Sequence, residues 1–372
     1  MATRLCAPLD KIPEALEKTG FILEHAVAEE FKRAGWSTIG GRYYVDDVDG
    51  RARELDLVAY RIHKSDDVEV VTAVLVSCKK DAETTWTFLT KDRPRQDPNF
   101  DWNPAHYWTD LQPLQTYLAS VPWKDKYIDA LGELYVGAFR AERDVFAFQQ
   151  VSTQSVVPRN DKAIFDSIAT LMKALDHEVQ ALPSRVKTRK RLYMFFLLSV
   201  VDAPLVDVRY NGLAAEAVEI ERITYLCRYM VRKRELSALV HFVRSDRLGE
   251  YIKSLTRLAK ANGKYMQSLV ASAYDAIKSD ESVQAYFSAR LRSRIAWRLD
   301  RFLSDRMLKN FSVGEFGLRY VGEVLQIEID VDDDEVLADL NKDEFVLDAT
   351  RVALRDIARY SGAFTFTWNI PF

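Results

Sequence analysis

The fold of this chain is decided by residues 53–80, which read RELDLVAYRIHKSDDVEVVTAVLVSCKK. Two strand-like runs, residues 54–62 and 68–78, flank a short polar link at residues 63–67. Apolar runs of this length on either side of a polar link are typical of a β-hairpin. The stretch therefore predicts two neighbouring strands of one sheet.

Charged side chains interrupt the apolar pattern at one end of this predicted hairpin. Because side chains alternate along a strand, Glu54 and Asp56 share a face of the first strand, and Ser77 and Lys79 share a face of the second. Charges among apolar strand residues are costly unless they pair or bind an ion. The hairpin thus predicts a cluster of carboxylates and a lysine, toward which Glu24 could lean from a preceding helix.

The rest of the chain predicts a mixed α/β sheet covered by helices, because strand groups alternate with helices. A first helix is expected at about residues 12–34, where Leu23, Val27, Phe31 and Ala34 line one face. Further strands are expected near residues 37–45, 134–139, 145–151, 192–201, 206–209, 220–231 and 239–243, and helices within 105–120, near 161–181 and at 248–260. Residues 91–113 are expected to be loop-like.

A domain boundary is expected at residues 260–263, Lys-Ala-Asn-Gly, so that residues 1–260 form one domain and residues 261–372 an appended α+β region. In the second part we expect a helix at about 282–310, two strands within 311–331, a helix at about 334–360 and a closing strand at 363–370.

Composition excludes several classes of protein. The 372 residues are 48% hydrophobic and 29% charged, which excludes a disordered or fibrous chain. The longest markedly apolar stretch, residues 192–201, is too short for the roughly 20 residues that cross a bilayer. The N-terminus lacks the apolar core of a signal peptide, and three cysteines cannot form a disulfide framework. We therefore expect a cytoplasmic protein without a membrane partner.

The net charge of −3 hides a strongly basic middle segment. Residues 183–311 carry 25 Lys and Arg against 13 Asp and Glu, a net charge of +12, between flanks of −7 and −8. Such a segment is a candidate surface for a polyanion, although it could instead dock on the acidic parts of the same chain.

Two groups of basic residues in this segment are candidate nucleic-acid ligands. Lys187, Arg189 and Lys190 crowd the approach to the strand expected at 192. Arg290, Arg294 and Arg298 recur at every fourth position and would form one stripe along a helix. Arginine suits phosphate because its planar group donates two parallel hydrogen bonds. The alternative for the stripe is a solvated helix face balanced by Asp300 and Asp305.

Motifs of other common chemistries are missing. The five histidines have no metal-ligand spacing, which argues against a zinc site. The chain has no GxGxxG, GxxxxGK[ST] or GxSxG motif, so nucleotide-binding and serine-hydrolase interpretations lose their usual support. The carboxylate–lysine cluster remains, and it matches the needs of phosphodiester hydrolysis. Carboxylates can hold Mg²⁺, which activates water, and a lysine can orient that water or stabilise the developing charge.

At these residues the sequence resembles the PD-(D/E)XK nuclease superfamily, which has the restriction-endonuclease-like fold. The resemblance rests on the order of a helix with Glu24, a strand with Glu54-Leu55-Asp56, a hairpin, and Ser77-Cys78-Lys79. It is greatest for prokaryotic variants with RELD and SCKK signatures, covers about residues 15–90 well, and extends over the sheet to about residue 260. It implies a restriction-endonuclease-like mixed β-sheet flanked by helices for residues 1–260.

The resemblance also implies roles for individual residues. Asp56 would be the metal-binding acid, Lys79 the motif lysine and Glu24 the first-helix acid, with Mg²⁺ or Mn²⁺ held by Asp56, Glu24, Glu54 and the backbone carbonyl of Cys78. Ser77 departs from the family, which usually has Asp or Glu there, so the catalytic set Asp56, Ser77, Lys79 and Glu24 has one carboxylate fewer than usual. Glu54 or Glu24 would have to compensate for it.

Each of these residues also has a purely structural interpretation. Asp56 and Lys79 could form only a cross-strand ion pair, and Glu24 could lie on a solvated helix edge. Glu54 could pair with Arg53 or Arg61.

The function expected from these observations is a metal-dependent nuclease that hydrolyses phosphodiester bonds, in DNA, in prokaryotic defence or DNA processing. The biological context rests on the resemblance alone. The alternative is a catalytically inactive nuclease fold that acts as a nucleic-acid-binding or interaction module, and a scaffold that assembles through residues 261–372 is a third. A homo-oligomer is compatible with each of them.

Overall fold

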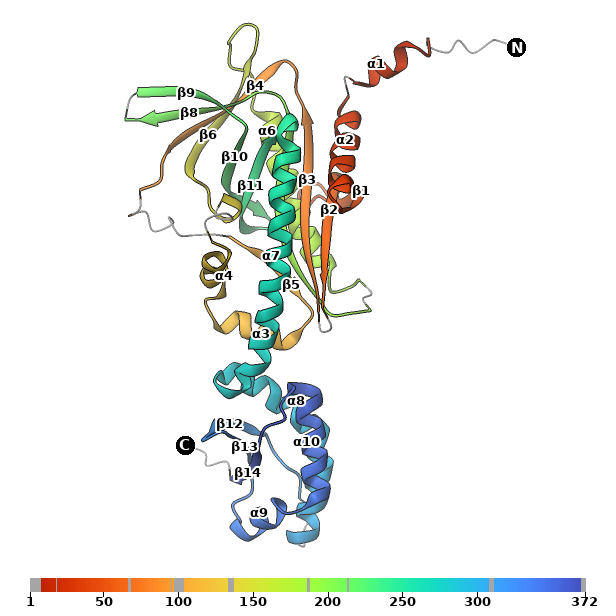
Figure 1. Cartoon of the computed structure of the whole chain (residues 1–372), viewed down its shortest axis with the longest axis vertical. Helices are drawn as coiled ribbons and strands as arrows, with labels where there is room; N and C mark the ends of the chain where they lie inside the picture. Colours follow the sequence, from red (N-terminus) through yellow and green to blue (C-terminus); the bar gives the residue numbers. More distant parts are fainter. Residues whose placement is uncertain are drawn as a thin grey trace, which may run out of the picture. The chain divides into compact units, whose positions relative to one another are not determined.

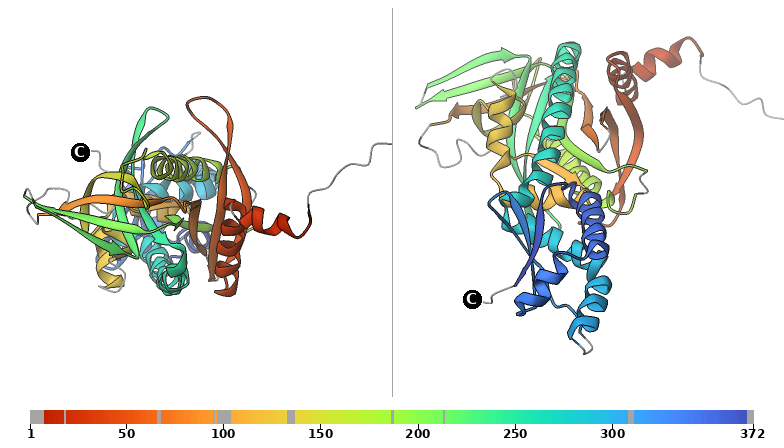
Figure 2. Two further views of the ribbon diagram at one scale, coloured as in Figure 1. Left: turned by 90° about the horizontal axis from the view of Figure 1, so that it is seen from above. Right: turned by 60° about the horizontal axis from the view of Figure 1, so that its bottom comes forward.

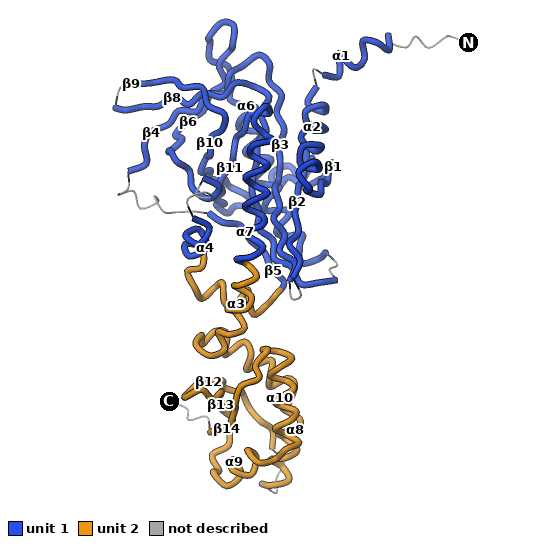
Figure 3. The backbone as a smooth tube through the Cα atoms, in the orientation of Figure 1, with its two compact units in different colours: residues 1–110, 124–265 blue, residues 111–123, 266–372 orange. Residues whose placement is uncertain are grey.

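The computed structural model describes residues 8–17, 19–65, 68–94, 96, 104–132, 137–185, 188–212, 214–307 and 311–368. It divides the chain into two units (Figure 3). The first unit comprises residues 1–110 and 124–265, and the second comprises residues 111–123 and 266–372.

A mixed sheet of seven strands forms the centre of the first unit (Figure 1). Its strands are β1 (Ser37–Val45), β2 (Ala52–Lys64), β3 (Glu69–Lys80), β5 (His106–Thr109), β7 (Arg191–Asp202), β10 (Arg222–Val231) and β11 (Arg234–Arg244). The order is β1-β2-β3-β7-β11-β10, and β5 pairs with β7. Strands β3, β7 and β11 are parallel, whereas β1–β2–β3 and β10–β11 pair in antiparallel fashion, as the predicted hairpin requires. The prediction of a mixed α/β architecture is confirmed.

Helices cover both faces of this sheet (Figure 2, left). Helix α6 (Lys162–Ala181) packs on one face, where the hydroxyl of its Ser167 donates to Ser199 of β7 over 2.7 Å. Helices α2 (Gly20–Arg33) and α7 (Leu248–Asp275) lie on the other face. There the amide of Asn262 on α7 donates to Thr72 of β3 over 3.1 Å.

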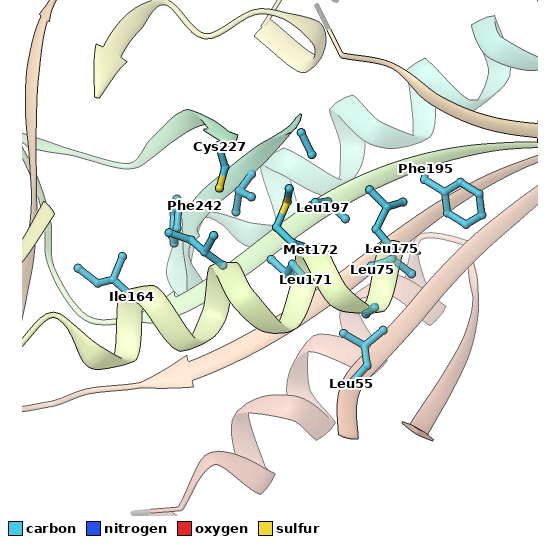
Figure 4. Packing of buried hydrophobic residues seen from close by; sticks show 14 of the residues in the cluster. Leu55, Leu75, Ile164, Leu171, Met172, Leu175, Phe195, Leu197, Cys227 and Phe242 are labelled. Atoms are coloured by element: carbon cyan, nitrogen blue, oxygen red, sulfur yellow. The ribbon is translucent and has the colours of Figure 1, made fainter. Parts of the chain in front are cut away.

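The main hydrophobic core lies between α6 and the sheet (Figure 4). Leu171 and Leu175 of α6 pack against the central strands, which contribute Leu75 and Leu197, and all four side chains are at most 2% exposed. The strand prediction for residues 192–201 is confirmed by β7, whose central residues are buried on both faces, as parallel strands require.

A second sheet of four strands completes the first unit. Its strands are β4 (Thr84–Asp92), β6 (Arg143–Ser152), β8 (Leu205–Asn211) and β9 (Ala214–Ile220), in the order β6-β4-β8-β9. The sequence analysis did not anticipate β4 or β9. The strand expected at residues 134–139 is wrong where it can be checked, because residues 137–139 are helical and residues 134–136 lie outside the described residues. The expected loop at 91–113 contains β5 and the start of a helix.

The second unit packs helices on a three-stranded sheet. Its helices are α3 (Gln112–Ser120), the end of α7, α8 (Glu281–Met307), α9 (Asp334–Leu340) and α10 (Glu344–Ala358), and its strands are β12 (Gly317–Val321), β13 (Val324–Ile329) and β14 (Phe364–Trp368). The expected strands and the long helix α8 are present. A single helix at 334–360 is wrong, because the Asp343 carboxylate accepts from the Val346 N–H over 2.9 Å and so starts a new helix.

Two other helix predictions are also wrong. Residues 12–34 form two helices, α1 (Lys11–Glu17) and α2, because Thr19 is extended and Thr and Gly disfavour the helical interior. Helix α7 does not end at residue 260 but continues to Asp275, so the expected boundary at 260–263 falls within a helix. Gly263 is required there, because an added Cβ would lie 2.2 Å from Cγ of His63 on β2.

The first unit also contains most of α4 (Trp123–Leu131). Within the described ranges, no helix is long and apolar enough to span a membrane.

Replacement of Leu171 by alanine should lower the free energy of unfolding by about 2–5 kcal/mol, because the side chain is fully buried and leaves a cavity. Urea unfolding followed by circular dichroism measures this change. Asp166→Ala on the same helix is the control: the side chain is half-buried and pairs only with the exposed Lys162 among the described residues, so the change should stay within about 0.5 kcal/mol of the parent. Equal effects of the two substitutions would contradict the assignment of this core.

Candidate active site

Strands β2 and β3 separate at the position of the predicted carboxylate–lysine cluster. Their ladder runs from the Lys64–Glu69 pair to the Leu57–Val76 pair and ends there. Beyond that point β2 continues to pair with β1, and β3 continues to pair with β7. We call this region the fork, and it comprises Glu24 of α2, Glu54 and Asp56 of β2, and Ser77, Cys78 and Lys79 of β3.

A glycine of the edge strand accompanies the separation. Gly41 of β1 lies between the paired residues Gly40 and Arg42 and has a φ of +61°, in the left-handed region that favours glycine. A Cβ at this position would lie 3.4 Å from Oε1 of Glu54. Irregular backbone at a strand glycine bends the ladder. Gly41 therefore belongs to the local geometry that presents Glu54.

Asp56 takes the place of a strand partner at the fork. The N–H of Cys78 donates to Oδ2 of Asp56 over 2.6 Å. In a strand, the N–H and C=O of one residue point toward the same neighbour. The carbonyl of Cys78 is therefore directed to the same side as Asp56.

The carboxylates of the fork are close enough to act on one another. Burial raises the pKa of Asp56, while the Cys78 N–H, the Lys79 charge and the Ser77 hydroxyl lower it in part. Burial also raises the pKa of Glu24, and the charges of Asp56 and Glu54 raise it further, against the charge of Lys79. The structure thus brings Glu24, Glu54, Asp56 and Lys79 together, including the helix residue that is most distant in sequence.

The structural alternative for Glu54, an ion pair with Arg53 or Arg61, is wrong. Glu54 pairs with neither expected arginine: Arg53 pairs with Asp49 over 2.7 Å, and Arg61 donates to the backbone of Ala34. Glu54 is exposed and accepts instead from the hydroxyl of Tyr43 over 3.3 Å.

Lys79 and Asp56 form no direct ion pair within 4.0 Å in the described part of the chain. The charge of Lys79 still acts on Asp56 and on Glu24. Its ammonium group is therefore near the carboxylates without being held by one of them.

Ser77 is the least satisfied residue of the fork. Its side chain is 0% exposed, and its hydroxyl has no hydrogen-bond partner among the described residues. The hydroxyl is close enough to Asp56 to lower the pKa of that carboxyl, although the two groups do not form a hydrogen bond. An unsatisfied buried hydroxyl costs about 1–3 kcal/mol, so a water or an ion that reached this group would relieve that cost.

The thiol of Cys78 has no part in the chemistry of the fork. It is 5% exposed, and burial, together with the charges of Asp56 and Glu24, raises its pKa well above the ordinary value. A thiol that stays protonated is a poor nucleophile. Cys78 therefore contributes its backbone and not its sulfur.

The donor set of the fork is compatible with Mg²⁺, although it is sparse. In the described residues, no three His, Cys, Asp or Glu side chains are placed to hold a metal ion together. Mg²⁺ needs fewer protein ligands than that, because it keeps several waters and is commonly bound through one or two carboxylates and substrate phosphates. Asp56, Glu24, the Cys78 carbonyl and the unsatisfied Ser77 hydroxyl meet this smaller requirement.

The first group of predicted nucleic-acid ligands lies far from the fork. Arg189 and Lys190 precede Arg191, which pairs with Glu69 at the opposite end of β3 from Lys79. Glu69 and Lys79 are ten positions apart along β3, which corresponds to a distance of about 33 Å. Arg189 donates to the backbone of Ser65 over 3.4 Å, and Lys190 donates to that of Asp110 over 3.3 Å. Lys187 lies outside the described residues.

The arginine stripe lies on α8 and is not uniform. Arg290 and Arg294 are exposed, whereas Arg298 is partly buried and lies over the rings of Trp297 and Phe345, 4.3 and 5.6 Å from their centroids. The expected balancing residue Asp300 accepts from the N–H of Val313 over 2.7 Å. Arg290 and Arg294 are therefore the members of the stripe that are most available to phosphates.

Sequence reasoning missed Gly41 and Tyr43 as neighbours of Glu54. A pair of glycines within a strand run is a readable sign of an irregular strand, and Gly40-Gly41 carried that sign. No family model, curated protein or solved structure matches the chain. The interpretation of the fork therefore rests on its own geometry.

Replacement of Asp56 by asparagine should stabilise the metal-free protein at neutral pH. The pKa of Asp56 is raised above its ordinary value of 3.8, so its contribution to stability is complete below that pH and is lost as the pH rises through the folded-state pKa. Asparagine keeps an oxygen for the Cys78 N–H but carries no charge. Urea unfolding in EDTA should show that the free energy of unfolding is higher for Asp56→Asn than for the parent, and that this difference grows between pH 4 and 7.

Glu235→Gln, on an exposed part of β11, is the matched control and should show no such growth. A loss of stability in Asp56→Asn at pH 7 would mean that an ionic interaction of Asp56, and not its burial, dominates at the fork.

Proposed function

We propose that the protein is a metal-dependent nuclease with a restriction-endonuclease-like domain in its first unit. The observation that carries this proposal is the meeting of Glu24, Glu54, Asp56 and Lys79 at the point where β2 and β3 separate. These residues come from one helix and two strands, so their proximity does not follow from sequence neighbourhood. The resemblance to PD-(D/E)XK nucleases supports the same interpretation.

Each residue of the fork would have its own role in phosphodiester hydrolysis. Asp56, Glu24 and the carbonyl of Cys78 would hold Mg²⁺, which supplies Lewis acidity and a bound water of lowered pKa. The ammonium group of Lys79, which no carboxylate of the described residues holds, would orient the attacking water or stabilise the charge that develops on the phosphate. The Ser77 hydroxyl would donate its hydrogen bond to a water at the fork.

We further propose that the substrate is DNA and that the protein acts in the cytoplasm. The +12 charge of residues 183–311 supports a polyanionic partner, and Arg290 and Arg294 present exposed guanidinium groups. The two buried free thiols, Cys78 and Cys227, are in keeping with a reducing compartment.

A second candidate function is a catalytically silent module that binds nucleic acid. Ser77 favours it, because a neutral hydroxyl stands where the family usually has a carboxylate, and because no three acidic side chains of the described residues are placed to hold one metal ion. The two functions differ in whether the chain cleaves nucleic acid in the presence of metal.

Cleavage of supercoiled, linear and single-stranded DNA and of RNA, in Mg²⁺ or Mn²⁺ against EDTA, tests the proposal. The parent should cleave DNA only with metal, and Lys79→Ala should lower the rate by about 10²–10⁴ because it removes a positioned charge. Lys80→Ala is the matched control, since that neighbouring ammonium group donates to the Glu17 carbonyl over 2.6 Å and lies 3.7 Å from Asp202.

The control should keep a rate close to that of the parent. If the parent binds DNA but cleaves none of the substrates with either metal, the silent module is the correct interpretation. Equal losses in Lys79→Ala and Lys80→Ala would show that the fork does not carry the chemistry.

Replacement of Ser77 by aspartate tests the departure from the family directly. A second carboxylate would then lie beside Asp56 in a position that is 0% exposed, so the metal-free variant should melt at a lower temperature. Mg²⁺ should recover that loss and raise the melting temperature more than it does for the parent, by mass action. Differential scanning calorimetry with and without Mg²⁺ measures both effects.

Ser77→Asn, which is similar in size but neutral, should not show the larger metal response. If neither the parent nor Ser77→Asp responds to Mg²⁺, the metal site does not lie at the fork.

A further inference from the structure

A cavity of about 400 Å³ lies in the first unit between the two sheets and α7. Strands β10 and β11 provide one wall, β8 and the start of β6 provide another, and α7 closes it. Strands β7 and β11 separate β10 from β3, so the cavity is about 14 Å from the fork across the sheet. Its volume is within the range of small-molecule sites.

Helix α7 turns one regular face toward this cavity. Tyr251, Ser254, Leu255 and Leu258 all line it and recur at i, i+3, i+4 and i+7, which places them on one side of the helix. Ile220 and Ile223 line the cavity from the strand side. The cavity therefore has apolar walls that suit the body of an organic molecule, with the Ser254 hydroxyl among them.

The charges of the lining are strongly unbalanced. Four arginines line the cavity, namely Arg143, Arg209, Arg222 and Arg257, against two carboxylates, Asp207 and Glu142. Asp207 is 3% exposed and already forms ion pairs with two of these arginines. Nε of Arg209 lies 2.8 Å and Nε of Arg143 lies 3.8 Å from Oδ2 of Asp207. Arg143 also pairs with Asp92 over 3.1 Å.

The other two arginines have no carboxylate partner in the described part of the chain. Arg257 donates only to the hydroxyl of Ser254, over 3.3 Å, and Arg222 is close enough to His241 and Tyr251 for its charge to act on both. Both side chains are exposed as well as part of the lining, so they can reach a ligand from solvent. Two unpaired guanidinium groups at one cavity are suited to an anion that accepts several hydrogen bonds.

The inner wall adds no competing charge. His241 is 3% exposed, and its Nδ1 lies 3.0 Å from the hydroxyl of Thr224, which pairs with it across β10 and β11. Burial lowers the pKa of His241 to about 4, so the imidazole is neutral at physiological pH. The positive charge of the site therefore comes from its arginines alone.

From these observations we propose that the cavity binds a small organic phosphate of about the size of a nucleoside monophosphate. Arg222 and Arg257 hold the phosphate, and the apolar face of α7 with Ile220 and Ile223 receives the organic part. The site is separate from the fork and does not depend on nuclease activity. It gives the protein a place where a small metabolite or signalling molecule can bind.

Isothermal titration calorimetry with the full chain tests this proposal, with AMP as the probe and with adenosine and inorganic phosphate as partial probes. AMP should bind with one-to-one stoichiometry, adenosine should not bind measurably, and inorganic phosphate should bind more weakly than AMP. Arg222→Gln and Arg257→Gln should each weaken AMP binding about tenfold or more, because each removes a charge-assisted contact.

Arg234→Gln on β11 is the matched control, since it removes the same charge from an exposed arginine outside the cavity. It should leave AMP binding unchanged, and so should Asp56→Asn, which separates this proposal from the proposed nuclease. Absence of AMP binding, or equal losses in Arg234→Gln and Arg222→Gln, would overturn the proposal. Equal affinities for phosphate and AMP would overturn the assignment of an organic ligand.

Discussion

One hydrogen bond at the end of a ladder fixes the place of Asp56, on which the arrangement of the fork depends. Where β2 leaves β3, the N–H of Cys78 loses its backbone partner, and Oδ2 of Asp56 accepts it instead. A buried N–H without a partner is costly, so an acceptor at position 56 is a structural need as well as a chemical one. Because only one carboxylate oxygen is used, the other remains available.

The same opening of the ladder explains why charges are tolerated so near a hydrophobic core. Leu55 and Leu75 are buried within two residues of Asp56 and Ser77, and an ordinary strand there would carry apolar side chains. At the fork, Glu24 of α2 lies close enough to Asp56 and Lys79 for their charges to act on it, and the charges of Glu24 and Lys79 shift the pKa of Cys78 in opposite directions. The burial that raises the pKa values of Glu24 and Asp56 is also what would strengthen their attraction to a bound cation.

Much of the first unit was predictable because its strands are marked by strong local patterns. The hairpin, β7 and α6 follow from apolar runs and their spacing, and the grouping of Asp56 with Lys79 follows from strand alternation. Strand β4 was missed although Trp86 and Phe88 alternate with threonines in the pattern of a half-buried strand. The breaks at Thr19 and Asp343 depend on single capping or extended residues, which periodicity does not reveal.

The sequence could not predict the cavity or the position of the basic residues. Arg222 and Arg257 are 35 positions apart, and they line one cavity only because α7 returns across β10 and β11. Conversely, Arg189 and Lys190 are near β7 in sequence, but the direction of that strand places them at its far end from Lys79. Such relations follow from topology and not from local pattern.

The parallel centre of the sheet has a consequence for how the chain reaches this structure. Strand β3 pairs with β7 from Glu69–Arg191 onward, and the paired residues are 122 positions apart in the sequence. Contacts between such distant residues form slowly, because the entropy of closing a long loop is lost before the contacts are gained. During synthesis, β3 must therefore wait with an apolar, unpaired edge until β7 has emerged from the ribosome. A chain that stops before residue 191 would keep that edge open and would be prone to aggregate through it.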